Sequence, residues 1–445
     1  MRWRSIWWFA PLWGLLSLTS AAQTRYIIRP TPTGSITDID GRHGLTLLGP
    51  LDNPKRGIYV VAAPSNIAAE EVIAEVGTDP EVSDIELDTK VALSESPTSL
   101  NQSTVAILDS MPAANAVGYY GTSVLGLYLS QPSASIIRLP DAQTRFATTG
   151  AGIVAIIDTG VDANHSALRG ALVPGYDFVH NIAGSASELI DLAEGNWAIL
   201  TQSNPDPCSK TQQLRLSQST VAILDQSSVA ILDTTKLPEF FGHGTMVAGV
   251  VHLVAPTAKI MPLKAFDGDG TARLSDILRA IYYAADNMAR VVNMSFSLLT
   301  PSIELADAVD YANEKGVIMV ASAGNTGTNF VGNPAAMQDV MGVASTTNND
   351  TRSQFSSYGT GTFVAAPGEQ VITLYPGQNY AVASGTSFSA PMVAGTAALA
   401  VHVNSRVDYS GASMAVSQAK PLASDLGYGR LDVYQAMQYA TANPW

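Results

Sequence analysis

Strand-like and helix-like patterns of apolar residues alternate along the chain from about residue 136 onward. Short apolar runs typical of buried strands are IVAIID, KIMPLK, VVNMSF and VIMVAS, and segments with helical spacing between them include LSDILRAIYYAAD and IELADAVDYANE. The segment SAPMVAGTAALAVHV predicts a further long helix of small residues. This alternation predicts an α/β fold, a mostly parallel sheet with helices on both faces. Active sites in such sheets gather beyond the carboxyl ends of the strands.

A smaller unit precedes this region, over residues 23–95. RYIIRP, GIYVVAAP and VSDIELDTKVAL read as strands, and SNIAAEEVIAEVG reads as an amphipathic helix. The pattern predicts an α+β unit of order β-β-α-β, with room for a second short helix that it does not locate. Residues 96–135 are rich in Ser, Pro, Gly and Ala and predict a linker.

Residues 183–238 interrupt the main pattern and predict an insertion. They contain a tandem repeat, QSTVAILD followed by QSSVAILD, and a third copy, STVAILDS, lies at 103–110 in the predicted linker. One interpretation is a repeat expansion tolerated in two surface segments. The alternative is that the β-prone copies pair as strands, within the insertion, with the linker copy, or between molecules.

The first 22 residues have the form of a secretory signal peptide. Arg2 and Arg4 precede an apolar run of roughly a dozen residues, and small residues follow up to Ala22. The run is short for a membrane span. We expect a secreted chain without a stable membrane span after signal removal; an uncleaved anchor is the alternative.

Composition excludes several classes of function. The 445 residues carry a net charge of −14, which argues against nucleic-acid binding because that requires basic patches. The one cysteine, Cys208, excludes an internal disulfide and a cysteine-rich zinc site. The six histidines are scattered without the spacing of metal ligands, so no metal site is assigned.

Three short motifs carry candidate chemistry. DTGVDANHSAL begins at Asp158, GHGTMVAG contains His243, and SGTSFSAP contains Ser387. A serine hydroxyl becomes a nucleophile when a histidine takes its proton and a carboxylate holds the imidazole in the right tautomer. His243 and Ser387 each begin a predicted helix, and Pro391 is expected in or near the first turn of the second. A helix amino end supplies N–H groups and positive potential where an oxyanion forms.

These motifs, together with SAGN and in the order Asp, His, Ser, resemble the subtilisin-like serine proteases, or subtilases. The resemblance covers roughly residues 136–440. It implies the subtilisin-like three-layer fold for this catalytic domain. Residues 23–95 resemble, more weakly, the inhibitory propeptide of the family, which implies a ferredoxin-like prodomain.

The resemblance implies a role for each matching residue. Asp158 would orient the histidine, His243 would act as general base and then acid, and Ser387 would form the acyl-enzyme. The side chain of Asn325 would stabilise the oxyanion together with the Ser387 N–H. The implied substrate-binding residues are Ser295, Phe296 and Ser297 on one side, where the substrate pairs as an extra strand, and Ser322, Ala323 and Gly324 as the other wall of the pocket.

Four aspartates end β-prone runs, so the assignment of Asp158 has rivals. Asp109, Asp225 and Asp233 end the three repeat copies, and Asp233 is the serious rival because it lies close before His243. Only Asp158 is followed by the Thr-Gly turn, which favours it.

The chain departs from the family pattern at several positions. Met246 stands where a second histidine is common, and Ser297 stands where glycine is usual, which puts the width of the substrate cleft in doubt. The family's calcium loop has no counterpart after the helix that begins at His243. No cofactor is expected to be required; Asp267 and Asp269 leave structural calcium possible without an assigned site, although two acidic residues in a turn are more often solvated.

The predicted function is a secreted serine endopeptidase that cleaves peptides or proteins. Its own propeptide would inhibit it within the precursor and would be released by self-cleavage between about Leu93 and Gln131. The alternative is a catalytically silent subtilase scaffold that binds peptides or partners at the cell surface.

Overall fold

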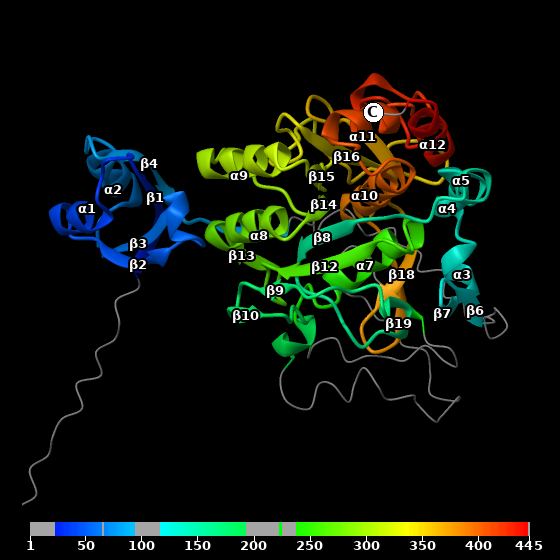
Figure 1. Cartoon of the computed structure of the whole chain (residues 1–445), viewed down its shortest axis with the longest axis horizontal. Helices are drawn as coiled ribbons and strands as arrows, with labels where there is room; N and C mark the ends of the chain where they lie inside the picture. Colours follow the sequence, from blue (N-terminus) through cyan, green and yellow to red (C-terminus); the bar gives the residue numbers. More distant parts are fainter. Residues whose placement is uncertain (1–22, 65, 94–115, 193–221, 225–236, 444–445) are drawn as a thin grey trace, which may run out of the picture. The chain divides into compact units, whose positions relative to one another are not determined.

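The structure is a computed structural model that describes residues 23–64, 66–93, 116–192, 222–224 and 237–443 (Figure 1). The chain divides into two compact units, the first ending at Asp88 and the second beginning at Thr89. The predicted signal peptide, Cys208 and the aspartates of the three repeat copies lie outside the described residues.

The first unit is a four-stranded antiparallel sheet covered by two helices. Its elements are β1 (Gln23–Pro30), α1 (Ile36–His43), β2 (Thr46–Pro50), β3 (Tyr59–Pro64), α2 (Ala69–Val76) and β4 (Val82–Leu87), with a 3₁₀ turn at Pro54–Arg56. The strand order β2-β3-β1-β4 is that of a ferredoxin-like unit, which confirms the predicted class. Helix α1 is the second short helix, capped by the Ser35 side chain and ended by Gly44 in the left-handed conformation.

The second unit is built on an eight-stranded sheet of order β10-β9-β12-β8-β14-β15-β16-β17. The strands are β8 (Ile153–Asp158), β9 (Tyr176–Asp177), β10 (Ile182–Ala183), β12 (Lys259–Lys264), β14 (Ala289–Met294), β15 (Ile318–Ser322), β16 (Val340–Thr346) and β17 (Val364–Pro367). All neighbours pair in parallel except β10 and β9. Strand β8, which carries Asp158, therefore lies inside the sheet between β12 and β14.

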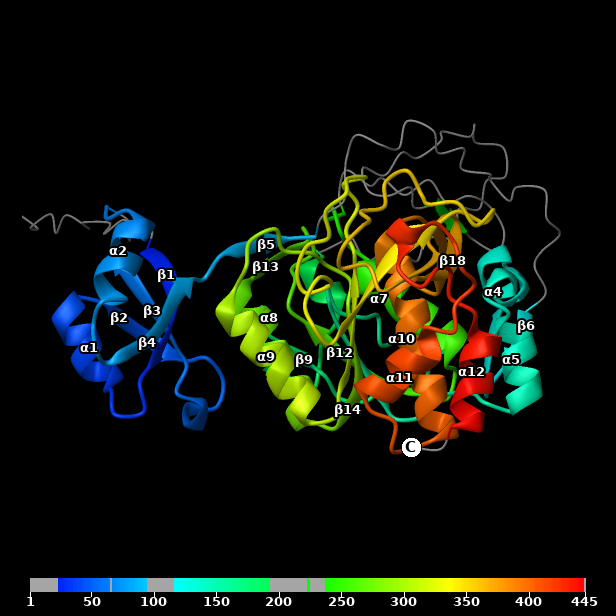
Figure 2. The same cartoon turned by 90° about the horizontal axis from the view of Figure 1, so that it is seen from above.

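Helices cover both faces of this sheet, as the sequence predicts. On one face lie α7 (His243–Val254) and α10 (Thr386–Val403); on the other lie α8 (Leu274–Asp286) and α9 (Ile303–Glu314) (Figure 2). Helices α11 (Tyr409–Val416) and α12 (Val433–Ala442) pack on α10, and α5 (Leu139–Phe146) packs on α12. Shorter 3₁₀ turns are Ser166–Leu168, Glu188–Asp191 and Ser424–Leu426.

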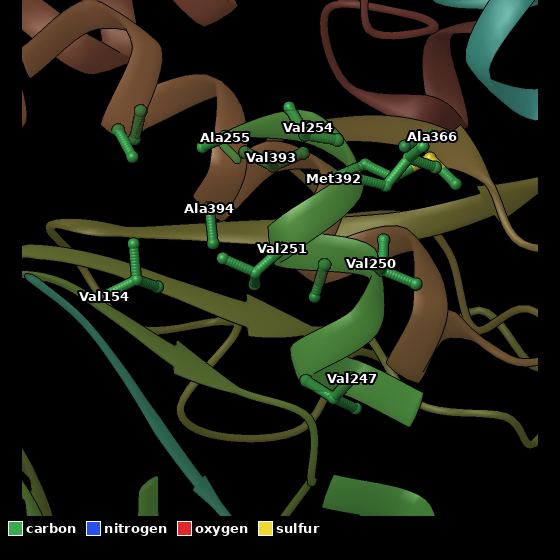
Figure 3. Packing of buried hydrophobic residues seen from close by; sticks show 14 of the residues in the cluster. Val154, Val247, Val250, Val251, Val254, Ala255, Ala366, Met392, Val393 and Ala394 are labelled. Carbon is green, nitrogen blue, oxygen red and sulfur yellow. The ribbon is translucent and has the colours of Figure 1, made fainter. Parts of the chain in front are cut away.

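The core lies between the sheet and the pair α7 and α10. Val154 of β8 packs in one cluster with Val250 and Val251 of α7 and with Met392 and Val393 of α10 (Figure 3). The small side chains of both helices allow them to pack closely on each other and on the strands. Among the described residues, α10 is the helix long and apolar enough to cross a membrane, and 89% of that stretch is buried inside the protein.

The structure differs from the predicted linker over residues 96–135. From Ala116 the chain forms the hairpin β6 (Ala116–Tyr119) and β7 (Thr122–Leu125), then the helices α3 (Gly126–Leu129) and α4 (Pro132–Ile136). Tyr128 is fully buried in the core cluster, and its hydroxyl donates to the Gly249 carbonyl. The Ser and Gly content of this stretch suggested a linker, although the run AVGYYGTSVLGLYL is largely apolar.

One copy of the repeat contributes a strand. β11 (Ala222–Leu224) pairs antiparallel with β19 (Asn379–Ala383), which in turn pairs with β18 (Val371–Tyr375). This copy therefore forms a strand, but its partner among the described residues is β19, not the insertion, the linker copy or another molecule. The remaining two-stranded sheet joins β5 (Lys90–Ala92) to β13 (Thr271–Arg273) within the second unit.

Candidate active site

Asp158 and His243 form a buried pair at the carboxyl edge of the sheet. Asp158 is the last residue of β8, and His243 is the first residue of α7. The Nδ1 atom of His243 lies 2.7 Å from Oδ1 of Asp158, and the Thr159 N–H donates to the same oxygen at 2.7 Å. Both side chains are about 1–2% exposed. The carboxylate thus fixes the imidazole with its other nitrogen, Nε2, on the opposite side of the ring.

One glycine of each motif is required by the close packing around this pair. A Cβ on Gly244 would lie 1.9 Å from the Gly160 carbonyl oxygen, so a side chain there would collide with the backbone of the other motif. Gly160 itself has φ of +103°, and its Cβ would lie 2.7 Å from the Ala186 carbonyl oxygen. The DTG and HGT sequences therefore pack backbone against backbone, which brings Asp158 and His243 together.

Ser387 lies at the amino end of α10, beside the histidine. It is the second residue of the helix and is buried. The next residue, Phe388, packs its ring 5.7 Å from that of His243. In the structure the Ser387 hydroxyl donates to the Ser295 carbonyl at 3.4 Å, so a rotation of the side chain is needed to direct it at the imidazole.

Ser295 supports the helix that carries the nucleophile. Pro391 is the sixth residue of α10, because the helix begins at Thr386, before Ser387. Because proline has no N–H, it cannot donate to the carbonyl of Ser387 four residues earlier. The Ser295 hydroxyl donates to that carbonyl at 3.0 Å and accepts from Asn293 Nδ2 at 2.9 Å. The proline in the helix is thus compensated by a side chain from the neighbouring strand.

Asn325 is held in the orientation that an oxyanion donor requires. It follows β15, and its Oδ1 accepts from both the N–H and the hydroxyl of Thr386, each at 2.9 Å. With the carboxamide oxygen directed at Thr386, the amide nitrogen is the donating end of the side chain. Thr386 precedes Ser387, so the amide and the nucleophile are placed by the same helix start.

The predicted substrate-binding residues lie along two neighbouring chain segments that follow β14 and end β15. Ser295, Phe296 and Ser297 follow β14; Ser322 ends β15, and Ala323 and Gly324 come next. Phe296 is 1% exposed and packs its ring on Phe266 at 5.2 Å, so its side chain belongs to the core. The backbone of these segments is the part that a peptide could pair with.

Ser297, the residue that departs from the family pattern, is accommodated by a glycine across from it. Its Oγ lies 2.2 Å from where a Cβ on Gly332 would stand, and 3.6 Å from that of Gly324. The hydroxyl thus occupies space that both glycines leave open. Whether Ser297 narrows the substrate cleft stays a prediction.

Several supporting residues could not be found from the sequence. Glu188 and Asp191, from the predicted insertion, are brought behind the Asp–His pair. Lys264 at the end of β12 is fully buried and donates to the carbonyls of Thr159 and Phe266 and to Asp191. These residues lie in segments without a recognisable motif, so the only signal is an acidic pair in an aperiodic stretch.

No group of three or more His, Cys, Asp or Glu side chains that could hold a metal ion occurs in the described part of the chain. Asp267, one of the two residues considered for calcium, accepts from the Thr271 N–H at 2.8 Å and stabilises its own turn. Helix α7 ends at Val254, and β12 begins at Lys259, so the short connection matches the sequence-based expectation. Met246 is buried in the core of this helix.

In serine-type peptidases the nucleophilic serine lies beside a histidine, and a buried carboxylate orients that histidine. The fold and the site of this chain have the features of that class of protein. Residues 150–422, more than half of the chain, match the model of the subtilase family, and the chain belongs to that family.

Named relatives agree with this family. The chain is 32% identical over 317 residues to thermitase of Thermoactinomyces vulgaris, covering 68% of this chain and 94% of thermitase. It is 34% identical over 301 residues to a thermophilic serine proteinase of Bacillus sp. strain AK1, covering 64% of this chain and 61% of that protein. The chain thus spans about three fifths of the length of this second relative.

Solved structures share the fold. Fervidolysin from Fervidobacterium pennivorans, described as a keratinolytic enzyme related to subtilisin, matches with a TM-score of 0.65 at 19% identity, over 94% of this chain and 61% of that chain. A lanthipeptide protease matches with a TM-score of 0.53 at 22% identity, over 70% of this chain and 93% of that chain. At these identities the likeness concerns the fold alone.

Proposed function

We propose that the chain is a secreted serine endopeptidase that hydrolyses peptide bonds through Asp158, His243 and Ser387. The observation that carries this proposal is the buried 2.7 Å contact between His243 and Asp158, with Ser387 at the adjoining helix start. A histidine so oriented can take the hydroxyl proton of Ser387 once that side chain rotates away from the Ser295 carbonyl.

The reaction follows from this geometry. Ser387 Oγ attacks the scissile carbonyl while His243 Nε2 accepts its proton, and Asp158 stabilises the imidazolium that forms. The amide of Asn325 and the Ser387 N–H at the start of α10 stabilise the oxyanion. The imidazolium then protonates the leaving amine, and a water molecule activated by the same histidine hydrolyses the acyl-enzyme.

The substrate is a peptide bound in extended form. It would pair as an added strand with residues 295–297, and residues 322–324 would form the other wall of the pocket for the side chain before the scissile bond. The β5–β13 pair supports such binding, because it shows that β13 of this unit accepts an extended segment as a partner strand.

Residues 23–95 are proposed to act as an intramolecular inhibitor. The segment from Thr89 to Leu93 lies along β13, and the Leu93 N–H donates to the Gly270 carbonyl at 2.8 Å. Gly270 lies against the ring of Phe240, which stands 6.3 Å from the ring of His243. The tail of the propeptide thus runs beside the residues that flank the catalytic histidine.

The site of self-cleavage can be bounded. The cut would come after Leu93, because the chain up to that residue pairs with β13. It would come before Ala116, because the hairpin and helices that follow, with the buried Tyr128, belong to the core of the catalytic unit. The predicted range up to Gln131 is thereby shortened to the segment between these two positions.

The test is intact-mass analysis of the secreted product from a host without extracellular proteases. We expect the wild type to lose residues 1–22 and then the propeptide, and a serine-directed phosphonate to label Ser387. The Ser387→Ala variant should lose only the signal peptide and remain unlabelled. A wild type that stays full length, is never labelled and cleaves no peptide would overturn the peptidase function and favour the silent scaffold.

A further inference from the structure

A fully buried glutamate lies behind the catalytic pair. Glu188 begins the 3₁₀ helix Glu188–Asp191, which the Ser187 side chain caps. Its side chain is 0% exposed, although the segment was predicted as a surface insertion. The approach of this segment to the turn after β8 depends on Gly160, whose missing Cβ leaves room for the Glu188 backbone nitrogen. A carboxyl placed so deeply needs partners that compensate its burial.

The partners of Glu188 are neighbours in sequence of the two catalytic residues. Its Oε2 accepts from the Gly242 N–H at 3.0 Å and from the Thr159 hydroxyl at 3.3 Å. Its Oε1 accepts from the Thr245 hydroxyl. Thr159 follows Asp158 directly, and Gly242 and Thr245 lie one residue before and two residues after His243. One side chain therefore contacts both the strand end and the helix start of the site.

The two threonines extend this contact to the backbone. The Thr159 hydroxyl accepts from the Gly244 N–H at 3.0 Å, and the Thr245 hydroxyl accepts from the Asp162 N–H at 2.8 Å. Each hydroxyl thus bridges the strand-end turn to the first turn of α7 and donates its own proton to Glu188. The Glu188 carboxyl thus completes a hydrogen-bond network that joins the turn after β8 to the first turn of α7.

We propose that Glu188 is a positioning residue of the active site, whose carboxyl ties the turn after β8 to the first turn of α7 and so fixes Asp158 against His243. This inference rests on the proposed peptidase function. Glu188 touches neither substrate nor reacting atoms; it acts through the two catalytic residues.

The charge state of Glu188 follows from its surroundings. The ionisable groups that interact with it are Asp158, Asp162, Lys264 and Tyr375. Burial raises the pKa of Glu188 to about 8; the Thr245 bond and Lys264 oppose this, whereas Asp162 and Asp158 add to it. Lys264 already pairs with Asp191. These effects together favour the neutral form of the Glu188 carboxyl at neutral pH, which adds no second negative charge behind the histidine.

The test compares Glu188→Ala and Glu188→Gln with Glu304→Ala and Glu304→Gln. Glu304 of α9 is an equally buried glutamate of the same unit and has no place in the site. Each variant is expressed as the full chain and, where maturation is slow, processed in trans by tagged wild-type enzyme that is then removed. We measure kcat and KM per phosphonate-titrated site from pH 5 to 10, with the thermal midpoint of each variant.

We expect Glu188→Ala to lower kcat at pH 7 at least tenfold and to change KM less than twofold. Glu188→Gln, a close match of the neutral acid, should restore kcat to within about threefold. It should also lack the inflection near pH 8 that we expect for the wild type. The inference is overturned if kcat of Glu188→Ala per titrated site equals that of the wild type, if the Glu304 variants lose as much, or if Gln gives no rescue.

A second measurement keeps the test decisive if variants turn over too slowly. In the Ser387→Ala background, the downfield proton resonance of the His243–Asp158 hydrogen bond reports the geometry directly. We expect it to shift or broaden with Glu188→Ala and to persist with Glu304→Ala; an unchanged resonance contradicts the inference. This readout needs no activity, so it separates failure of the positioning role from failure of the proposed function, which phosphonate labelling of the wild type reports.

Discussion

The two halves of the candidate active site are supported by groups of different chemistry. Behind Asp158 and His243 lie ionisable side chains, namely Glu188, Asp191 and Lys264. Around Ser387 and Asn325, the bonds described above come from hydroxyls, carboxamides and peptide groups, those of Ser295, Asn293 and Thr386.

This difference in chemistry follows the charges of the reaction: the carboxylate of Asp158 is charged throughout, whereas the oxyanion beside Ser387 forms only briefly. The histidine half must stabilise an imidazolium beside a permanent carboxylate, so buried ionisable groups there can tune its field. The serine half must receive a transient oxyanion, for which fixed neutral dipoles are suited because they need no reorganisation. We therefore expect pH to alter the histidine half more than the serine half.

The largest effect is expected for Asp158→Asn, on the histidine half. An asparagine cannot hold the imidazole in the required tautomer, so kcat should fall about 10⁴-fold with little change in KM. Steady-state kinetics with a peptide substrate measure this. The matched control is Asp233→Asn, which should leave kcat unchanged; a collapse in that variant alone would transfer the role to Asp233.

Asn325→Ala removes a neutral donor from the serine half. We expect kcat to fall about 10²- to 10³-fold, because the oxyanion loses one hydrogen bond that exists only in the transition state. Rates measured from pH 6 to 9 should give a constant ratio to the wild type. A ratio that changes across this range would show that the serine half also depends on an ionisable group.

Glu188→Gln tests whether the histidine half contains a buried group whose ionisation changes the free energy of unfolding with pH. The folded pKa of Glu188 is about 8 and the unfolded value about 4.5, so the folded chain holds a proton that the unfolded chain releases between these values. Raising the pH from 5 to 8 should therefore lower the free energy of unfolding of the wild type by a few kcal/mol. Denaturant titrations in the Ser387→Ala background should show a weaker dependence in Glu188→Gln, and an equal dependence would contradict the shifted pKa.

Ser295→Ala is expected to have the smallest effect. It removes the donor to the Ser387 carbonyl that Pro391 leaves unpaired, which should lower the free energy of unfolding by about 1–2 kcal/mol at every pH. In a Pro391→Ala background the helix regains its own N–H donor, so the same substitution should matter less. Strictly additive losses in the double variant would show that the two residues do not compensate each other.

The catalytic residues were predictable because their signals are local. Asp158, His243 and Ser387 each stand in a short motif rich in glycine or small residues, and such a motif can be recognised without knowing the distant contacts that require its glycines. The alternation of strands and helices was equally predictable, because the strands of a parallel sheet covered on both faces are continuous apolar runs in the sequence.

What the sequence concealed depends on contacts between distant residues. Glu188 stands in an aperiodic segment, and its burial follows only from the fold that brings Thr159 and Thr245 to it. Tyr128 lies in a stretch whose composition suggested a linker, yet it packs on α7. The second-turn position of Pro391 needed a compensating hydroxyl from Ser295, a partner that no local pattern reveals.

Helix α10 determines when during synthesis the chain can become active. It is buried along nearly its whole length and packs on β14, β15, β16 and β17 and on α7, although it comes after all of them in sequence. A ribosome-bound chain from which this helix has not yet emerged lacks a helix that covers the sheet, and it also lacks Ser387. Contacts between residues so far apart form slowly, so the proposed proteolysis can begin only after α10 has left the ribosome and packed on the sheet.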